Sequence, residues 1–297
     1  MNLERLPGRF GAALTGVDLA VGISLQSFRD ILEALLEHRF VVLPGQRLTH
    51  DSYLAFARHW GQPVLLISAS NRTDSHPHII KQTNSAAIPA FLRNTANHWH
   101  CDSSYEEQIA QTTMLYGVQA PEQGGETLFS DLVAAYEALP AARRSELARY
   151  QVWHATSGAT AFPDETIVKP DTLPIEYRKT ITPTPPVLHP LVQRHPLIGR
   201  EALYGLGGSA YGIEGLSAQE GAELLLTLRR YATQPQFCSS YKLMPGDVLI
   251  WDNLSVMHRA TPISYSDAPG ERRENYRISL KGLPAELAAP SATAQLL

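Results

Sequence analysis

The chain has strand-like segments near both of its ends, with helical segments between them. An apolar run at residues 40–46, "FVVLPGQ", ends in a Pro-Gly turn, and residues 246–282 contain three further runs: "GDVLIWDN", "SVMHRATP" and "ENYRISLKG". A doubly wound parallel sheet needs strands and helices that alternate regularly, and this chain lacks that alternation. The pattern therefore predicts a mostly β fold with flanking helices, built as a barrel or a sandwich.

Helical periodicity is confined to a few segments. Within residues 24–39, apolar side chains recur at spacings of three and four. Three further segments favour helices: residues 50–61, 132–149 and 217–233. Asp51 or Ser52 is the expected cap at the start of the helix in residues 50–61.

The segment of residues 155–186 has a different character. It is rich in Thr, Pro and Gly and shows no period. Loops of this length inside a compact domain are usually functional or mobile. We expect either a lid over a site or a disordered insertion, within a single domain that spans residues 1–297.

Composition argues against several classes of function. Of the 297 residues, 44% are apolar and 18% charged; the net charge is −4 and no run of Lys or Arg occurs, which disfavours nucleic acid as the main partner. The start, "MNLERLPGRF", lacks the apolar core of a signal peptide, and no apolar run approaches the ~18 residues of a membrane span. Two cysteines, Cys101 and Cys238, are too few for a disulfide framework. We expect a cytoplasmic protein without a membrane segment.

The stretch "NHWHCDSS" at residues 97–104 places His100 and Asp102 one residue apart. On a strand both side chains would project from the same face and could give two ligands to a divalent metal. A third ligand must come from elsewhere, and His258 is the best candidate because it interrupts an apolar stripe with Val256 and Ala260. Such a histidine is either a satisfied core residue or a ligand.

Two histidines and one carboxylate leave coordination positions open, which suits non-haem Fe(II) that activates oxygen. Zinc can use the same ligands, so a zinc-dependent hydrolase is the alternative. Arg273 and Arg277 lie four residues apart and would share one face of a strand. A guanidinium can hold a carboxylate with two hydrogen bonds, as an oxygenase needs for the far carboxylate of 2-oxoglutarate. Otherwise the two arginines are surface residues paired with Glu271 and Glu274.

Four motifs, in this order and spacing, resemble the taurine dioxygenase family. They are "WHCDSSY" (99–105), "GGETLFSDL" (124–132), "PGDVLIWDNLSVMHRATP" (245–262) and "RRENYRISL" (272–280). "GAALTGVDL" (11–19) and "VVLPGQ" (41–46) match its N-terminal pattern, so the likeness covers about residues 8 to 283. The family consists of Fe(II)- and 2-oxoglutarate-dependent oxygenases, and it includes dioxygenases for phenoxyalkanoates and alkylsulfates.

The resemblance implies a double-stranded β-helix, a cupin-like jelly roll, with the iron between its two sheets. Carried over by position, it implies that His100, Asp102 and His258 bind the iron. It further implies a dioxygenase that uses Fe(II), 2-oxoglutarate and O2, and that releases succinate and CO2. Its action would be to hydroxylate a small, anionic organic substrate, or to cleave the substrate through that hydroxylation.

The resemblance also implies roles around the iron. Thr127 matches the threonine whose hydroxyl binds a carboxylate of 2-oxoglutarate, and Arg273 matches the arginine that holds the same carboxylate. Arg277 matches the next arginine, which reaches the acidic group of the substrate or shares the co-substrate. The loop "ISYSDAPGE" after His258 is a few residues longer than in the family, so both arginines stay candidates for the co-substrate anchor.

The substrate itself is less constrained. Residues 65–74, "LLISASNRTD", hold no match to the histidine that contacts taurine in the taurine enzymes, so taurine is not the expected substrate. Arg277 favours a carboxylate, sulfonate or sulfate ester. Tyr105, Tyr204 and Tyr211 either line the apolar part of the substrate site or pack in the core. We expect a homo-oligomer, as is common among relatives.

Overall fold

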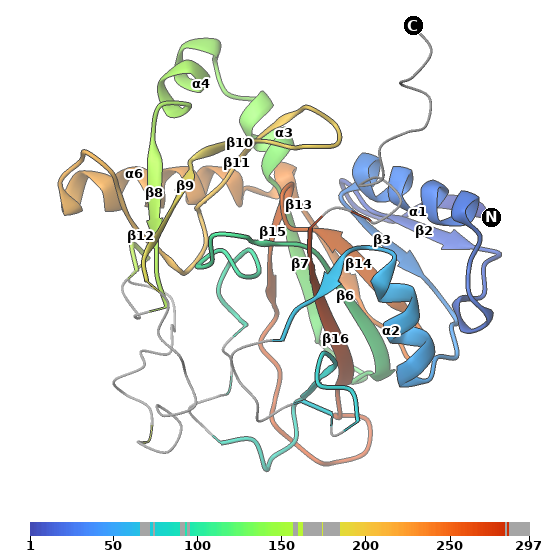
Figure 1. Ribbon diagram of the computed structural model, residues 1–297. Helices are drawn as coiled ribbons and strands as arrows, with labels where there is room; N and C mark the ends of the chain where they lie inside the picture. Colours follow the sequence, from blue (N-terminus) through green and yellow to red (C-terminus); the bar gives the residue numbers. More distant parts are fainter. Residues whose placement is uncertain are drawn as a thin grey trace, which may run out of the picture.

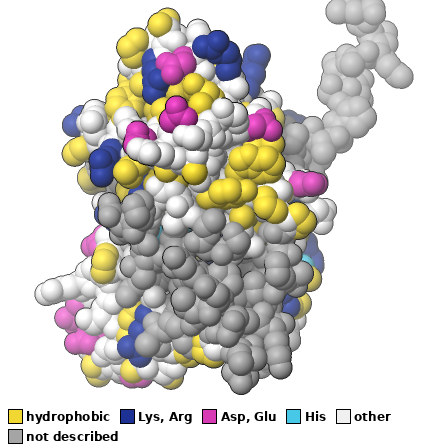
Figure 2. Space-filling view, turned by 90° about the vertical axis from the view of Figure 1, so that its left-hand side faces the viewer, with side chains coloured by type: hydrophobic (Ala, Val, Ile, Leu, Met, Phe, Trp, Pro, Cys, Tyr) yellow, Lys and Arg dark blue, Asp and Glu magenta, His cyan; other side chains and the backbone are white. Residues whose placement is uncertain are grey.

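Two mainly antiparallel sheets pack face to face and form the centre of the molecule (Figure 1). The structure is a computed structural model that describes residues 1–65, 72–73, 75–89, 93, 96–156, 160–162, 174, 185–282 and 284. Within that part of the chain, no helix is both long and apolar enough to cross a bilayer. On the face in Figure 2, acidic and basic side chains are interspersed.

The larger sheet contains strands from both ends of the chain. In spatial order it runs β1 (Asn2–Arg5), β2 (Ala12–Thr15), β3 (Phe40–Leu43), β14 (Val248–Asp252), β6 (Ala110–Gln119), β16 (Glu274–Lys281) and β4 (Gln62–Pro63), with β5 (Ile80–Thr83) also paired to β16. Only the β2–β3 pair of these strands is parallel. The early and late strand runs of the sequence therefore meet side by side.

The smaller sheet has the order β13 (Cys238–Lys242), β7 (Glu126–Asp131) and β15 (Val256–Ala260). Its inner face packs on the larger sheet, where the rings of Phe40 and Phe129 stack with centroids 4.5 Å apart and Trp251 lies 5.7 Å from Phe129. Strands far apart in sequence thus alternate between two layers, as a double-stranded β-helix requires. The mostly β prediction with flanking helices is confirmed.

The two faces of the larger sheet have different surroundings. Along β6, Met114 points outward into a core shared with α1 (Leu25–His38) and α2 (His50–Arg58), which cover this face (Figure 1). Leu115, the next residue, points inward between the sheets. The sheet therefore has an apolar outer face, buried under helices, and an inner face that is available to a site.

Both of these helices begin at a side-chain cap. Ser24 accepts a hydrogen bond from the backbone N–H of Ser27 at the start of α1. For α2 the cap is Thr49, not Asp51 or Ser52 as expected. Ser52 is the third helical residue, and its backbone N–H donates to Thr49 while its hydroxyl accepts from the Thr49 backbone.

A third group of elements packs on the outer face of the smaller sheet. It contains β8 (Gln151–His154), β9 (Val187–Pro190), β10 (Val192–Arg194), β11 (Glu201–Leu203), β12 (Ala210–Ile213), α3 (Leu132–Glu137), α4 (Ala141–Leu147) and α6 (Ala218–Ala232). Met257 of β15 joins their apolar core. Two short 3-10 helices, η1 (Leu19–Val21) and η4 (Pro235–Phe237), complete the described elements. Most of the expected lid, residues 155–186, lies outside the described residues.

A buried ion pair joins α1 to α3. Arg39 ends α1 with a positive φ of 70°, and its Nε lies 3.2 Å from Oδ1 of Asp131. The Asp131 carboxylate also caps α3, because it accepts the backbone N–H groups of Val133 and Ala134. The Arg39 side chain is 3% exposed, so Asp131 compensates a charge that water does not reach.

We expect Asp131→Ala to lower the free energy of unfolding by at least about 3 kcal/mol. The substitution removes the carboxylate that pairs with the buried Arg39 guanidinium, and it also removes the cap of α3. Urea denaturation followed by circular dichroism measures this. Arg143→Ala, which breaks a half-exposed pair with Glu146 on α4, serves as the control and should cost less than about 1 kcal/mol. Equal losses in the two variants would contradict the role given to Asp131.

Candidate metal centre and co-substrate pocket

A pair of backbone hydrogen bonds brings His100 to His258. The N–H of each residue donates to the carbonyl of the other, both at 2.9 Å, so residue 100 continues the smaller sheet beyond β15. The two imidazole rings lie 4.3 Å apart between centroids. Because β15 also pairs with β7, His258 is held on both sides and faces the space between the sheets.

Asp102 reaches the same place by a turn and not by the strand expected for residues 97–104. Residue 100 makes only a single bridge, and residues 102–105 form a turn in which Ser103 has a φ of 56°. The alternation of side chains along a strand therefore does not explain the geometry. The turn folds the carboxylate of Asp102 back toward the two imidazoles.

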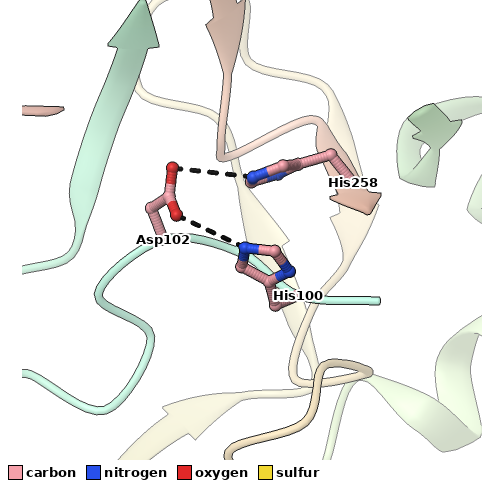
Figure 3. A group of neighbouring side chains, drawn as sticks. All are labelled: His100, Asp102 and His258. Carbon is pink, nitrogen blue, oxygen red and sulfur yellow. Dashed lines mark ion pairs between the residues drawn. The ribbon is translucent and has the colours of Figure 1, made fainter. Parts of the chain in front are cut away.

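The three side chains point toward one another (Figure 3). Nε2 of His100 lies 3.7 Å from Oδ1 of Asp102, and Nε2 of His258 lies 3.7 Å from Oδ2. One ligand atom from each of the three falls within 4.8 Å of the others. The separations of 3.7 Å are longer than hydrogen bonds, and they leave a space that all three groups face.

Burial sets the protonation of this group. Burial, followed by the nearby His258 imidazole, lowers the pKa of His100 to about 4, and burial is also the main reason that the pKa of His258 falls to about 4. Burial alone would raise the pKa of Asp102, but the Arg277 guanidinium and then the imidazoles hold it well below its usual value. At neutral pH the group is two neutral imidazoles and a carboxylate, the forms in which these side chains bind metals.

The hydrogen bond of His100 fits a metal ligand. Nδ1 of His100 lies 2.9 Å from the carbonyl of His98, so Nδ1 carries the proton and the lone pair of Nε2 faces Asp102. Nδ1 of His258 is buried and has no hydrogen-bond partner among the described residues. Two imidazoles and one carboxylate leave positions open for other ligands, which suits Fe(II).

A cavity of about 560 Å³, counted with its opening to solvent, adjoins the two imidazoles. Its lining contains His100, His258, Thr127, Arg273 and Arg277, together with Gln82, Ala96, Leu115, Gly125, Leu243, Trp251, Ala260 and Asn275. Thr127 lies on β7 and pairs with Ala260 of β15. The structure therefore places the threonine and both arginines of the sequence hypothesis around one pocket.

Arg273 lies immediately before β16 and is partly buried. Burial lowers its pKa, and its Nε has no hydrogen-bond partner among the described residues. Gly125 lies beside its side chain, since a Cβ there would make an ordinary van der Waals contact, 3.8 Å, with Cδ of Arg273. A buried N–H group without a hydrogen-bond partner is costly, and a carboxylate bound to this guanidinium would remove that cost. The pocket thus presents a site for a carboxylate at the position of Arg273.

Arg277 lies closer to the metal group. Its Nη2 is 2.7 Å from Oδ1 of Asp102 and 3.0 Å from the hydroxyl of Ser279. The alternative in which both arginines are surface residues paired with Glu271 and Glu274 is wrong for this geometry. Glu274 instead pairs with Lys81, 2.8 Å away, and its nearest arginine is Arg272.

The three tyrosines differ in their surroundings, and none belongs to the described lining of the pocket. Tyr105 follows the Asp102 turn, and burial raises its pKa to about 12. Tyr204 is fully buried in the core, with its ring 5.9 Å from His154. Tyr211 is partly exposed on β12.

The pocket also contains residues that the sequence analysis did not identify. Asn275 lies two residues before Arg277 on β16, so the alternation of side chains could have found it. Trp251 packs its ring 4.6 Å from that of His258. Gln82 comes from β5, and no local pattern connects it with the metal motifs.

Comparisons with known proteins agree with this geometry. The family model for "Taurine catabolism dioxygenase TauD, TfdA family" matches residues 2–279. The chain is 32% identical to an alpha-ketoglutarate-dependent 2,4-dichlorophenoxyacetate dioxygenase of Cupriavidus pinatubonensis, over 84% of this chain and 88% of the relative. It is 30% identical to an alpha-ketoglutarate-dependent sulfate ester dioxygenase of Pseudomonas putida, over 95% and 90%.

Solved structures show the same likeness. A taurine dioxygenase from Burkholderia xenovorans has a TM-score of 0.75 and 28% identity, covering 95% of this chain and 89% of its own. The protein AAD-2, in complex with Mn(II) and N-oxalylglycine, has a TM-score of 0.74 and 26% identity, covering 95% and 97%. The match of the family model over nearly the whole chain, on a jelly roll that gathers two histidines and an aspartate, establishes that the chain belongs to the TauD/TfdA dioxygenase family.

Proposed function

We propose that this chain oxidises a small anionic organic substrate at the His100, Asp102 and His258 group. The protein is a 2-oxoglutarate-dependent non-haem iron dioxygenase, and its cofactors are Fe(II), 2-oxoglutarate and O2. The observation that supports an anionic substrate at this metal group is a single pocket, which contains two facing imidazoles and two guanidinium groups. An iron site accounts for the imidazoles, and two anions account for the guanidinium groups.

His100, Asp102 and His258 would hold Fe(II), which with 2-oxoglutarate activates O2 while the co-substrate is converted to succinate and CO2. The protein supplies neutral imidazoles, a carboxylate and a buried setting for that chemistry. The rings of Trp251 and Phe129 pack near His258, at 4.6 and 6.3 Å, and exclude water from its inner side. The cavity lies beside both imidazoles and would admit the co-substrate to them.

We assign the far carboxylate of 2-oxoglutarate to Arg273 and Thr127. Arg273 is the guanidinium whose Nε is buried and has no hydrogen-bond partner among the described residues, and Thr127 lines the same pocket with a hydroxyl that can donate. The complex of AAD-2 supports a co-substrate of this shape, since N-oxalylglycine differs from 2-oxoglutarate by one N–H in place of a methylene group. This assignment chooses between the two arginines that the sequence left open.

We assign the acidic group of the primary substrate to Arg277. Its guanidinium is partly exposed, lies next to Asp102 and borders the cavity, so it can meet an anion close to the metal. The named relatives act on a phenoxyacetate and on sulfate esters, both of which carry an anionic group on an apolar body. Tyr105, on the turn after Asp102, is the tyrosine best placed to contact such a body.

A zinc-dependent hydrolase with the same ligands is not favoured. The named relatives depend on alpha-ketoglutarate, a co-substrate that a zinc-dependent hydrolase does not need. The hydrolase would also work without oxygen. Succinate release that stops under anaerobic conditions separates the two functions.

Removal of one imidazole tests the metal centre. Anaerobic wild-type protein with Fe(II) and 2-oxoglutarate should show a weak visible charge-transfer band, and His258→Ala should lose it because the chelate is incomplete. His76→Ala serves as the control and should keep the band, because His76 is hydrogen-bonded to Asp51 and does not belong to the metal group. A band that persists in His258→Ala contradicts the ligand assignment.

The two arginines can be separated by kinetics. Arg273→Ala should raise KM for 2-oxoglutarate roughly 10- to 150-fold, since a charged hydrogen bond contributes about 1.5 to 3 kcal/mol. Arg277→Ala should instead raise KM for the acidic substrate, with a much smaller effect on 2-oxoglutarate. Succinate release is measured over a panel of phenoxy acids, sulfonates and sulfate esters. The opposite division between the variants would reverse the assignment.

A further inference from the structure

Three strands of the larger sheet place a row of side chains behind the Asp102 carboxylate. Thr113 of β6 pairs directly with Trp251 of β14 on one side and with Ser279 of β16 on the other. Directly paired residues project from the same face of a sheet, so this row faces the smaller sheet. Thr113 and Asn253 have no exposed surface, and Asp102 is 4% exposed.

A continuous set of hydrogen bonds links this row to the carboxylate. The Thr113 hydroxyl donates to Oδ2 of Asp102 at 2.6 Å, and it accepts from Nδ2 of Asn253 at 3.0 Å. Oδ1 of Asn253 accepts from Nε1 of Trp251 at 3.0 Å and from the backbone N–H of Asp102 at 3.3 Å. Every polar atom of the Asn253 side chain therefore has a partner in this group.

Donor and acceptor chemistry dictates the direction of each bond. An indole N–H and a backbone N–H can only donate, so the oxygen of Asn253 must face Trp251 and Asp102. Its amide nitrogen then faces Thr113 and occupies a lone pair of the hydroxyl. Thr113 has a single proton, which the short contact gives to Asp102. The orientation of one amide thus determines that the carboxylate receives a donor.

The segment that carries Asn253 is itself anchored. Asn253 lies in the turn between β14 and β15, and its backbone N–H donates to the carbonyl of Gln111 at 2.8 Å. Oδ2 of its neighbour Asp252 lies 3.0 Å from Nε2 of His195, with both side chains buried. The amide is therefore presented from a rigid turn, as a supporting hydrogen bond to a metal ligand requires.

We propose that Asn253, acting through Thr113, is a positioning residue for the metal-binding carboxylate of Asp102. The pair holds Oδ2 by one donor, while Arg277 contacts Oδ1 from the other side. The carboxylate is thereby fixed in the orientation that faces both imidazoles before a metal arrives. The inference rests on the proposed metal centre and adds to it two residues that do not touch the metal.

Substitutions at Thr113 test the hydrogen bond with little change of shape. Thr113→Val removes the hydroxyl and should weaken Mn(II) binding to the full-length protein roughly 10- to 100-fold, the usual effect of losing a supporting partner of a ligand. Thr113→Ser keeps the hydroxyl and should stay within about twofold of wild type. Ser130→Ala removes a buried hydroxyl that donates to the carbonyl of Ala232, away from Asp102, and it should also stay within about twofold.

A double-mutant cycle tests whether Asn253 acts through Thr113. Asn253→Ala alone should weaken Mn(II) binding, and in the Thr113→Val background it should cost less than it does alone, because of its links to Asp102 only the bond to the Asp102 backbone N–H then remains to be lost. Urea unfolding of each metal-free variant shows that the protein titrated is folded; should Thr113→Val fail to fold, Thr113→Ala and Asn253→Ala take its place. Rescue by Thr113→Ser is the result that a purely structural role would not produce.

The outcomes distinguish this inference from the proposed function. If wild-type protein binds Mn(II) and shows the charge-transfer band with Fe(II) and 2-oxoglutarate, the metal centre stands. Equal Mn(II) affinity of Thr113→Val and wild type then overturns the positioning role alone, as does equal weakening in Thr113→Ser and Thr113→Val. Wild-type protein that binds no metal overturns both proposals.

Discussion

The site depends on two backbone hydrogen bonds between His100 and His258. These bonds join a segment that follows β5 to a strand more than 150 residues later in the chain, and they place both imidazoles beside the space between the sheets. Everything else at the centre is arranged around that contact. The Asp102 turn follows it on one side, and β7 with Thr127 supports it on the other. A bridge of backbone atoms can hold the ligands in register without using the ring nitrogens that a metal needs.

Charge at the centre is balanced by burial and by pairing. Burial keeps both imidazoles neutral, while Arg277 and the Thr113 hydroxyl favour the ionised form of Asp102. Arg273 has no such compensation among the described residues, and it faces the same pocket. The Asp102 carboxylate is therefore already paired with a cation, while the Arg273 guanidinium can still bind an anion. This asymmetry is the physical basis for assigning the co-substrate to Arg273.

Much of the fold could be predicted because its signals are local. Apolar periodicity located α1 and α6, and apolar runs located β3, β14, β15 and β16. The sequence predicted which residues form the site better than it predicted how they are arranged. His100, Asp102 and His258 do converge, but Asp102 comes from a turn with a positive φ at Ser103 and not from a strand. The cap of α2 was misplaced for a similar reason, since Thr49 and Ser52 bond reciprocally and only the backbone path distinguishes them.

By itself, the sequence determined the elements, the kinds of side chain available for a metal and two anions, and the family, because each depends on residue type and spacing along the chain. The tertiary structure alone decided which arginine has a buried Nε without a hydrogen-bond partner among the described residues and which contacts Asp102, and it brought Asn253 and Thr113 behind that carboxylate. These relations depend on the register between β6, β14 and β16. The register depends on packing between strands that are distant in sequence, so it cannot be predicted from the residue pattern of one strand.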